Sequence, residues 1–523
     1  MRRAKTIMFL GTGSDVGKSV LAAALCRVLK QDGYRVAPFK AQNMALNSFV
    51  TPDGGEMGRA QVMQAEAAGV EPHVDMNPIL LKPTSQKGSQ VIVLGKPIGN
   101  MSAPEYYRRK KELIPLVMAA FERLSRSFDV IVMEGAGSAV EINLKEHDLV
   151  NLSMARRTGT PCVLVGDIDR GGIFASLLGS LALMDEQERG LVKGFIVNKF
   201  RGDPSLFEDG IKILEERSSL PVLGVIPYFD HILLPQEDSV ALSRICRASV
   251  ESNDGVKLGI VRLPYISNYT DFDVFSGDSG VLVRYFSNPE EIFSFDAVIV
   301  PGSKNTIHDL RFLHESGLAD ALRAFWKSGR TVVGLCGGYQ MLGNCVRDPF
   351  GVEGTPSEMQ GLGILPIVTE MVREKLTHQV EVVPNDNNPL WSGEMSSVVL
   401  RGYEIHMGRS YLKTGDVADP SKDAAGLSIF KIVSRSGRPA DEFEGCASLE
   451  GNAWGTYVHG IFDNAEFRRW FVSKVALLRG KKIAWEKEIP EHWSAVLDKQ
   501  YDLLAEHFRK HVKVELLYSI MGL

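Results

Sequence analysis

The chain has 523 residues and a mass of 57.6 kDa, which allows two to four domains and excludes a single small binding module. Its 44% hydrophobic and 24% charged residues are typical of a folded globular protein and exclude a mainly disordered or fibrous chain. The net charge of -5 provides no general electrostatic footprint for nucleic acid, so we expect no nucleic-acid partner.

The cysteines and the N-terminal residues indicate the compartment. Six cysteines without a C-x-x-C pair are too sparse for a disulfide framework or a structural zinc site. The apolar stretch near the N-terminus is only five residues long before glycines and Asp15 follow, which predicts a buried strand and not a signal peptide. No uncharged apolar run reaches the length of about 18 residues that a transmembrane helix needs. We therefore expect a cytoplasmic protein with no membrane partner.

Short β-rich runs alternate with helical patterns from residue 1 to about 235. The runs typical of strands are TIMFL, RVAPF, DVIVM, PCVLVG, GFIVN and PVLGVIP. A helical pattern over Val20–Leu29 follows the first of them. This alternation predicts a mostly parallel sheet covered by helices, and the polar and small residues around 235–257 predict a linker after it.

A second α/β series starts at KLGIVRLP and continues through FDAVIVPGS and RTVVGLCGG to WGTYVHG. We expect loop-rich insertions near 346–360 and 383–398, and helices from Trp470 onward that pack on this second domain. The predicted fold is therefore two doubly wound α/β domains. A phosphate-loop domain covers 1–240, a linker covers 241–255, and the second domain covers 256–523 and ends in a helical extension.

A glycine-rich loop connects the first predicted strand to the first predicted helix. Its sequence GTGSDVGKS contains Gly11, Gly13, Gly17, Lys18 and Ser19. Glycines permit a tight backbone whose amides bind phosphate oxygens, while the lysine reaches the terminal phosphates and the serine can ligate Mg²⁺. Five residues separate Gly11 from Gly17, one more than the usual pattern has, and a glycine-rich turn with a chance Lys-Ser is the alternative. The loop predicts an ATP site.

Two polar residues at later strand ends extend this predicted site. Glu134 ends the run DVIVME, and a carboxylate there would hold Mg²⁺ together with Ser19, because ATP chemistry needs a metal to neutralise phosphate charge. The alternative is an acid that caps a turn. Asn198 follows GFIV, and its amide can donate to and accept from a purine edge, although an ordinary loop asparagine is nearly as consistent with the sequence.

One cysteine of the second domain has the sequence context of a nucleophile. The run TVVGLCGGYQMLG places Cys336 after a strand, with Gly334 and Gly338 two residues away on either side. A nucleophile on a sharp strand-to-helix turn needs such small neighbours, and the following helix N-terminus stabilises a thiolate. His459, at the end of WGTYV, is the best-placed base. A buried core cysteine and a core histidine are the alternatives.

These motifs resemble known families. G-x-C-x-G with Gln340 and a distant histidine is similar to class I glutamine amidotransferases, and the long phosphate loop with EGAG is similar to dethiobiotin synthetase. Their fusion in this order resembles the cobyrinate-amidating enzymes of cobalamin biosynthesis. The specific marks are KAQNM (40–44), LNS (46–48), GRAQ (58–61), DIDRGG (167–172), NKFRGD (198–203) and YEIHMG (403–408). The branch that amidates the a and c side chains has K-x-G-P-D-Y-I-D where this chain has KAQNM.

The resemblance implies ATP- and glutamine-dependent amidation of the b, d, e and g carboxylates of a (usually adenosylated) cobyrinic acid a,c-diamide, giving cobyric acid. It implies that Cys336 forms a glutamyl thioester and releases ammonia, with His459 as the proton carrier. ATP would convert a corrin carboxylate to an acyl phosphate. The implied substrates are glutamine and a corrin polycarboxylate, and the implied cofactors are ATP and Mg²⁺. The sequence does not indicate an oligomeric state.

The sequence departs from the usual amidotransferase pattern after the histidine. Many class I enzymes have Pro-Glu there, completing a Cys–His–Glu triad, but this chain has Gly460 and Ile461. Glu404 or His406 in YEIHMG could orient the site, or could equally be structural or substrate-positioning residues. The basic run Arg108–Lys111 could attract a polycarboxylate or form a solvated helix face.

Two further functions fit parts of the pattern. The nearer is the a,c-diamide synthase or another ATP-dependent amide ligase. The other is a partitioning-type phosphate-loop switch ATPase, which makes no amide bonds and has no use for GLCGGYQ and VHG.

Overall fold

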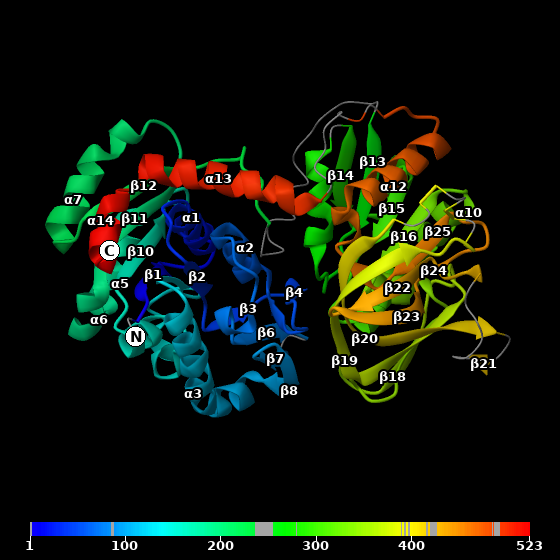
Figure 1. The fold of residues 1–523 in the computed structure, drawn as a ribbon, viewed down its shortest axis with the longest axis horizontal. Coiled ribbons are helices and arrows are strands. Elements are labelled where there is room, and N and C mark those ends of the chain that lie inside the picture. The colour runs from blue at the N-terminus through cyan, green and yellow to red at the C-terminus, as the bar shows by residue number, and fades with distance from the viewer. Residues whose placement is uncertain are drawn as a thin grey trace.

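The computed structural model describes residues 3–523 apart from 85–87, 236–254, 279, 389, 392–393, 396–397, 415–416, 419–425, 484 and 486–491. Two α/β lobes lie side by side, an N-terminal lobe built on residues 3–235 and a C-terminal lobe built on residues 255–483 (Figure 1). The predicted linker over 241–255 lies outside the described residues except for Gly255. Within the described part of the chain, no helix has the length and apolarity required to cross a membrane.

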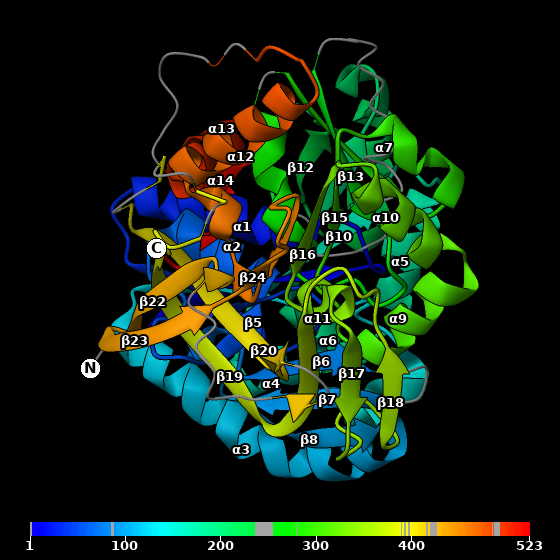
Figure 2. The same ribbon diagram turned by 90° about the vertical axis from the view of Figure 1, so that its right-hand side faces the viewer.

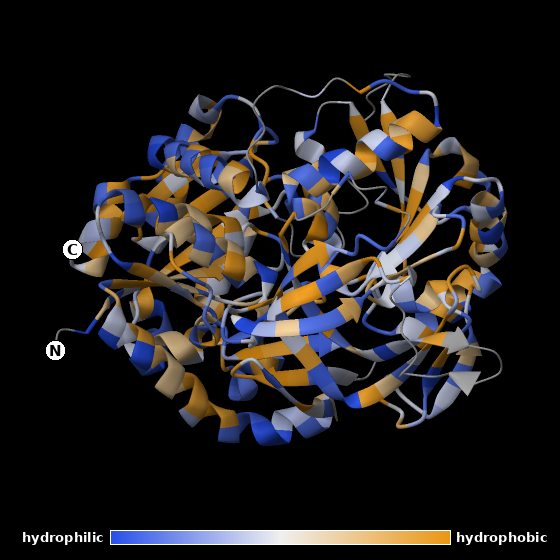
Figure 3. Cartoon of the chain, turned by 45° about the vertical axis from the view of Figure 1, so that its right-hand side comes forward, coloured by the Kyte–Doolittle hydropathy of each residue, from blue (hydrophilic) through white to orange (hydrophobic). Residues whose placement is uncertain are grey.

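A six-stranded parallel sheet forms the centre of the N-terminal lobe. Its order is β12 (Val222–Pro227), β11 (Val192–Phe200), β10 (Cys162–Asp167), β1 (Lys5–Gly11), β9 (Val130–Glu134) and β2 (Val36–Phe39). The helices around it are α1 (Lys18–Gln31), α2 (Arg59–Ala68), α3 (Ala103–Ser127), α4 (Leu152–Thr158), α5 (Ile173–Leu183), α6 (Glu186–Leu191) and α7 (Glu208–Ser218). The central strands are buried on both faces because helices cover the sheet on either side (Figure 3). The continuous apolar runs of the sequence correspond to these buried strands. The parallel sheet predicted from those runs is confirmed.

Shorter strands of the N-terminal lobe face the other lobe. A four-stranded sheet contains β3 (Gln42–Met44), β6 (Ile79–Pro83), β7 (Gly88–Val93) and β8 (Lys96–Ser102), and a hairpin joins β4 (Ser48–Val50) to β5 (Glu56–Gly58). Strand β4 packs against strands of the C-terminal lobe.

The C-terminal lobe has its own parallel sheet. Its order is β14 (Val281–Phe286), β13 (Val256–Val261), β15 (Ala297–Val300), β16 (Thr331–Leu335) and β25 (Ala453–Thr456), with β24 (Cys446–Ala447) added antiparallel at the edge. The α-helices of this lobe, in the part of it that the structure describes, are α9 (Thr306–Glu315), α10 (Leu318–Lys327), α11 (Gly337–Leu342) and α12 (Ala465–Leu478). The second α/β series is thus confirmed.

An eight-stranded sheet that the sequence analysis did not predict covers one side of this lobe (Figure 2). Its strands are β17 (Cys345–Asp348), β18 (Ser357–Gln360), β19 (Ile367–Pro384), β20 (Leu400–Thr414), β21 (Val417–Ala418), β22 (Phe430–Arg435), β23 (Arg438–Glu444) and β26 (Val458–His459). The loop-rich insertion expected near 346–360 is a hairpin, in which β17 and β18 pair with each other and turns and bends over 349–356 connect them. Turn-forming residues between these short strands had suggested loops.

The C-terminal helices are α13 (Trp493–His511) and α14 (Val514–Met521). The sequence predicts that they pack on the second domain, but this is wrong, because they pack mainly on the N-terminal lobe. Figure 1 shows α13 spanning the two lobes. The Arg27 guanidinium of α1 binds Asp498 and Asp502 of α13, each at 2.8 Å. The Lys513 amide donates to the Leu223 carbonyl of β12 at 2.8 Å. The amphipathic pattern of α13 indicates which face is buried but not which lobe covers it.

A buried ion cluster ties the lobes together. The Glu56 carboxylate of β5 accepts from Lys82 Nζ of β6 at 2.9 Å and also from Lys375 Nζ of β19 in the other lobe. All three side chains are at least 95% buried. Burial by itself raises the pKa of Glu56, but the charges of Lys375 and Lys82 outweigh it and hold that pKa well below its ordinary value.

Removing the carboxylate charge should therefore destabilise the protein. We expect Glu56→Gln to lower the free energy of unfolding by about 3 kcal/mol, because two buried ammonium groups lose their counter-charge. Urea denaturation followed by tryptophan fluorescence measures this change. Glu374→Gln is the matched control, since Glu374 is 75% exposed and its ion pair with Arg409 is at the surface. Equal stability of the two variants would contradict the prediction.

Candidate functional site

The predicted phosphate loop lies between the buried strand β1 and helix α1, as expected. Gly17 has a φ of 100°, and a Cβ at this position would lie 2.1 Å from Asn198 Nδ2, so both conformation and space require glycine. Lys18 Nζ donates to the carbonyls of Gly13 at 2.8 Å and Gly137 at 3.0 Å. The Asn198 amide donates to the Val16 carbonyl at 2.8 Å, so this predicted base-reading residue contacts the loop itself.

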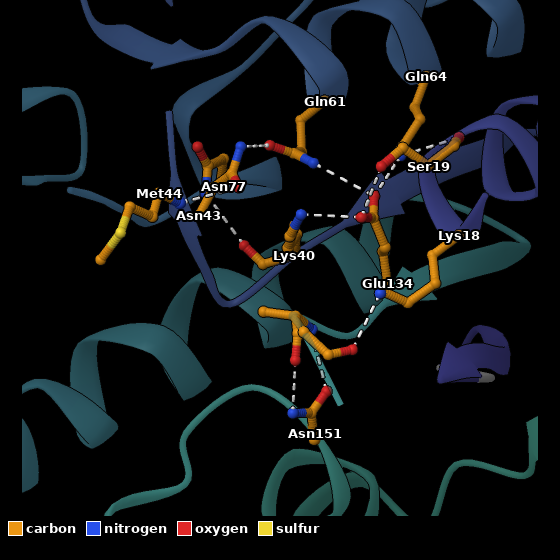
Figure 4. Close-up of polar contacts among 12 residues, drawn as sticks. Lys18, Ser19, Lys40, Asn43, Met44, Gln61, Gln64, Asn77, Glu134 and Asn151 are labelled. Atoms are coloured by element: carbon orange, nitrogen blue, oxygen red, sulfur yellow. Dashed lines mark hydrogen bonds and ion pairs between the residues drawn. The ribbon is translucent and has the colours of Figure 1, made fainter. Parts of the chain in front are cut away.

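Glu134 lies at the carboxyl end of β9 and accepts hydrogen bonds from several side chains (Figure 4). Its Oε1 accepts from Ser19 Oγ and Lys40 Nζ, each at 2.8 Å. Its Oε2 accepts from the α2 amides of Gln64 at 2.6 Å and Gln61 at 3.4 Å. Burial opposes the charged form, but Lys40 and these hydrogen bonds outweigh burial and lower the pKa of Glu134. The site therefore holds a charged carboxylate, whose cationic partner in this structure is Lys40.

The donor set here fits Mg²⁺. The Ser19 hydroxyl and the Glu134 carboxylate are adjacent oxygen ligands, and Gln64 Oε1 is buried without a hydrogen-bond partner. Among the described residues, no three His, Cys, Asp or Glu side chains are grouped to hold a metal ion. A metal at this position would consequently depend on nucleotide phosphates for further ligands, as in other phosphate-loop sites.

The residues Lys40, Gln61 and Gln64 were not predicted as site residues, although KAQNM and GRAQ were singled out as marks of the resemblance. The signal available in the sequence was the i, i+3 spacing of Gln61 and Gln64, which places both amides on one face of a helix. Both are fully buried. A buried polar face of this kind requires partners, which Glu134 supplies.

A cavity of about 1170 Å³ opens beside the phosphate loop. Large apolar side chains that are exposed to solvent line it, namely Met44, Ile142, Leu144 and Leu183. Cationic side chains also line it, namely Lys18, Lys40, Lys110, Lys145, Arg156, Arg157 and Arg170. Of the basic run Arg108–Lys111, only Lys110 lines the cavity, with Nζ 5.7 Å from the centre of the Tyr107 ring. The acidic side chains Asp15, Glu134, Glu141, Asp148 and Glu188 line it as well, so the cavity combines apolar surface with a modest excess of cationic side chains.

Cys336 forms a strained turn between β16 and α11, as its glycine neighbours predicted. Its φ is 50°, a value that non-glycine residues rarely adopt. A Cβ on Gly334 would lie 2.7 Å from the Tyr339 amide nitrogen, and one on Gly338 would lie 1.9 Å from the Val300 carbonyl oxygen. Only glycines permit this close backbone approach, which is the geometry of a nucleophile elbow.

His459, at the end of β26, lies against Cys336, and an aspartate supports it. The charge of Cys336 acts on the His459 ring, and the Cys336 thiol itself donates to the Ile405 carbonyl, with Sγ 3.8 Å from that oxygen. On its other side, His459 Nδ1 lies 2.6 Å from Asp271 Oδ2, and the Gly460 amide donates to Asp271 Oδ1 at 3.0 Å. Burial disfavours the imidazolium, but the charges of Asp271 and Cys336 outweigh burial and raise the pKa of His459 to about 10. This arrangement is the one that a nucleophile, a base and a group orienting that base require.

Glu404 and His406, the two residues that could orient the Cys336–His459 site according to the sequence, have other partners. Glu404 accepts from Arg435 Nε at 2.8 Å, and although burial alone would raise its pKa, the nearby His406 and Arg435 lower the pKa of Glu404 to about 2. His406 Nδ1 lies 2.8 Å from the Gly408 carbonyl, and its ring stacks on Tyr457 at 3.8 Å. Neither side chain orients His459. Asp271 takes that position from η5 (Tyr269–Gly277), in the segment that follows β13.

The position of Asp271 predicts a specific defect for Asp271→Asn. We expect the rate of the reaction at Cys336 to fall at least about 100-fold with little change in KM, because a neutral amide does not stabilise the imidazolium and can hold the ring in the wrong tautomer. The wild-type imidazolium persists as pH rises until about 10, whereas in the variant it is lost at lower pH. A pH–rate profile measures both effects. Asp320→Asn, at an 89% exposed position, is the control, and a profile identical to wild type would contradict the role of Asp271.

The predicted residues thus form two clusters. Gly11, Gly13, Gly17, Lys18, Ser19, Glu134 and Asn198 surround the phosphate loop of the N-terminal lobe. Cys336 and His459 lie in the C-terminal lobe, Cys336 directly after β16 and His459 three residues after its parallel neighbour β25, near the strand ends where ligands collect in α/β sheets.

Comparison with known proteins gives matches over both lobes. Residues 7–239 match the family described as CobQ/CobB/MinD/ParA nucleotide binding domain, and residues 257–467 match the CobB/CobQ-like glutamine amidotransferase domain. A cobyric acid synthase from Syntrophobacter fumaroxidans is 59% identical over 526 residues, covering 100% of this chain and 99% of that protein. Cobyric acid synthases from Pelotomaculum thermopropionicum and Moorella thermoacetica are each 46% identical, covering 99% of this chain and 97% and 98% of theirs.

Proposed function

The chain belongs to the cobyric acid synthase family of glutamine amidotransferase ligases, and we propose that it amidates the b, d, e and g carboxylates of (adenosyl)cobyrinic acid a,c-diamide with ATP and glutamine. The observation that carries this proposal is the pairing of a phosphate-loop site with a Cys–His–Asp site in one chain. The a,c-diamide synthase and a switch ATPase are less well supported, because the relatives that match the whole chain are cobyric acid synthases.

In the C-terminal lobe, Cys336 would hydrolyse glutamine. Its sulfur attacks the side-chain carboxamide carbon, a C–S bond forms, and the C–N bond breaks as His459 delivers a proton to the leaving ammonia. Water then hydrolyses the thioester to glutamate. Asp271 holds the imidazolium that this cycle requires. Backbone amides of Gly337 and of the Pro301–Ser303 turn are the candidates for binding the oxyanion, since a Cβ on Gly337 would lie 2.7 Å from the Ser303 amide nitrogen.

In the N-terminal lobe, ATP would activate the acceptor carboxylate. A carboxylate oxygen takes the γ-phosphoryl group and ADP leaves, which turns an unreactive carboxylate into an acyl phosphate. Ammonia then attacks the acyl carbon and expels phosphate. Lys18 and Lys40 supply positive charge where phosphate charge develops, and the glycine loop supplies amides. Mg²⁺, held by Ser19 and Glu134, would neutralise phosphate charge.

The cavity beside the loop suits a corrin polycarboxylate. A corrin is a broad apolar macrocycle with carboxylate-bearing side chains around its edge. Met44, Ile142 and Leu183 are each more than half exposed and offer apolar surface, while Lys110 and the arginines of the cavity offer positive charge. These residues would hold the acceptor next to the phosphate loop.

The free thiols of the described cysteines agree with a cytoplasmic location.

The proposal is tested with the purified chain, ATP, Mg²⁺, glutamine and cobyrinic acid a,c-diamide. Mass spectrometry should show four successive products, each with one acid hydroxyl replaced by an amino group, formed together with ADP and glutamate. Cobyrinic acid without the a and c amides is the comparison acceptor. Amidation of that acceptor with no reaction of the a,c-diamide would contradict the proposal and favour the a,c-diamide synthase.

A further inference from the structure

A segment of the N-terminal lobe, Asn47–Arg59, contacts the surroundings of the glutaminase residues in the other lobe. We propose that Asn47 and Arg59 are positioning residues for the Cys336–His459 site, so that the N-terminal lobe completes the glutaminase from outside. This inference rests on the proposed glutaminase function. Three groups of contacts carry it.

The first group fixes the turn that carries Asp271. Asn47 Oδ1 accepts from the Tyr269 amide at 3.2 Å, and the Ser48 amide donates to Asn268 Oδ1 at 3.2 Å. Asn268 has a φ of 52°, a conformation that needs support from its surroundings. It immediately precedes η5, in which Asp271 is the third residue. Contacts from the N-terminal lobe therefore determine where this carboxylate lies.

The second group supports the face of the His459 ring. Tyr403 stacks on His459 with ring centres 5.3 Å apart and an interplanar angle of 21°. The Tyr403 hydroxyl donates to the Ser48 carbonyl at 3.4 Å, and the Phe49 ring lies 5.1 Å from the Tyr403 ring. Tyr403 is thus sandwiched between the catalytic imidazole and strand β4. A displacement of β4 would be transmitted to His459 through one ring.

The third group is electrostatic and centres on Arg59. Its guanidinium lies 3.6 Å from Glu66 and 5.3 Å from the centre of the Phe49 ring, and its charge acts on Asp273 and Asp463 in the C-terminal lobe. Burial raises the pKa of Asp273 to about 8 and that of Asp463 to about 7, against the lowering effect of Arg59. Arg59 Nε and Asp273 Oδ2 are both buried without a hydrogen-bond partner.

The charge of Asp271 also acts on these two acids, because it contributes to the raised pKa values of Asp273 and Asp463. Arg59 supplies opposing positive charge from the N-terminal lobe. It is also the first residue of α2, whose Gln61 and Gln64 bind Glu134. Arg59 therefore belongs to the same helix that contacts Glu134.

The test compares Arg59→Gln, Arg59→Lys and Asn47→Ala with the wild type. Arg123→Gln is the matched control, because Arg123 forms a 2.6 Å ion pair with Asp75 within the N-terminal lobe. Three quantities are measured: kcat and KM for glutamine hydrolysis, the pH dependence of Cys336 alkylation by iodoacetamide, and amidation driven by free ammonia.

We expect Arg59→Gln and Asn47→Ala to lower kcat for glutamine about 10-fold with KM unchanged, because misplacement of His459 affects the transition state more than binding. The alkylation profile should shift in both variants, and ammonia-driven amidation should remain at the wild-type level. Arg59→Lys should recover most of the lost rate, since it keeps the charge. Arg123→Gln should match the wild type in all three measurements.

Two results would overturn the inference. The first is that Arg59→Gln and Asn47→Ala match the wild type both in kcat for glutamine hydrolysis and in the pH dependence of Cys336 alkylation. The other is an equal loss of glutamine-driven and ammonia-driven amidation, which would assign these residues to the N-terminal lobe's own stability. Absence of glutamine hydrolysis in the wild type would instead refute the proposed function, so the two failures are distinguishable.

Discussion

Replacing Cys336 with serine should abolish amidation driven by glutamine and preserve amidation driven by high concentrations of free ammonia. The serine hydroxyl keeps the size of the side chain, but it is far less nucleophilic than a thiolate paired with His459. Loss of a nucleophile from such a set lowers turnover by about 10⁴-fold or more. The ATP site lies in the other lobe and does not contact Cys336, so ammonia supplied from solution should still be used.

The comparison requires a second cysteine variant. Cys345→Ser removes a partly exposed thiol from β17 of the same lobe and should leave both activities at the wild-type level. Product formation from each nitrogen source is followed by chromatography of the corrin products. Loss of both activities in Cys336→Ser, with the fold intact by circular dichroism, would contradict the division of labour between the lobes.

Replacing Lys18 with alanine should have a broader effect than replacing Cys336, with both glutamine-driven and ammonia-driven amidation lost. Lys18 is the ammonium group of the phosphate loop, placed at the first residue of α1 among loop carbonyls. A single cation that stabilises a transferring phosphoryl group contributes on the order of 10³-fold or more to the rate. Cys336 should still be alkylated by iodoacetamide at the wild-type rate, because His459 and Asp271 are unchanged.

Lys30→Ala is the control for this variant, since Lys30 is exposed near the end of the same helix. It should retain ATP-dependent amidation. ADP release and corrin products are measured with each nitrogen source. Ammonia-driven amidation by Lys18→Ala at more than a tenth of the wild-type rate would remove Lys18 from the proposed phosphate site.

The parts of the fold that follow from local physics were predictable. Continuous apolar runs such as TIMFL and DVIVM require burial on both faces, and the intervening helical patterns supply the cover. The glycines around Cys336 were informative because a sharp turn excludes side chains there whatever the rest of the fold does. In the same way, Gly17 in the left-handed region marks the phosphate loop.

The parts that depend on long-range packing were not predictable from one sequence. Asp271 meets His459 across 188 residues of chain, and nothing local distinguishes it from Asp273 or Asp278 in the same segment. Gln61 and Gln64 resemble ordinary helix residues until Glu134 is known to face them. Tertiary contacts decide these roles, and local propensity does not report them.

The return of α13 to the N-terminal lobe has a consequence for biosynthesis. Arg27 is made early, whereas its partner Asp498 follows 471 residues later, a delay on the order of a minute on the ribosome. In topological terms the C-terminal lobe is an insertion within the N-terminal lobe. The N-terminal lobe is built from residues that precede the C-terminal lobe and from helices α13 and α14, which follow it. The nascent phosphate-loop lobe cannot reach its final packing before the glutaminase lobe has been synthesised. The two activities should therefore mature together, and a nucleotide-hydrolysing lobe should not emerge ahead of its nitrogen source.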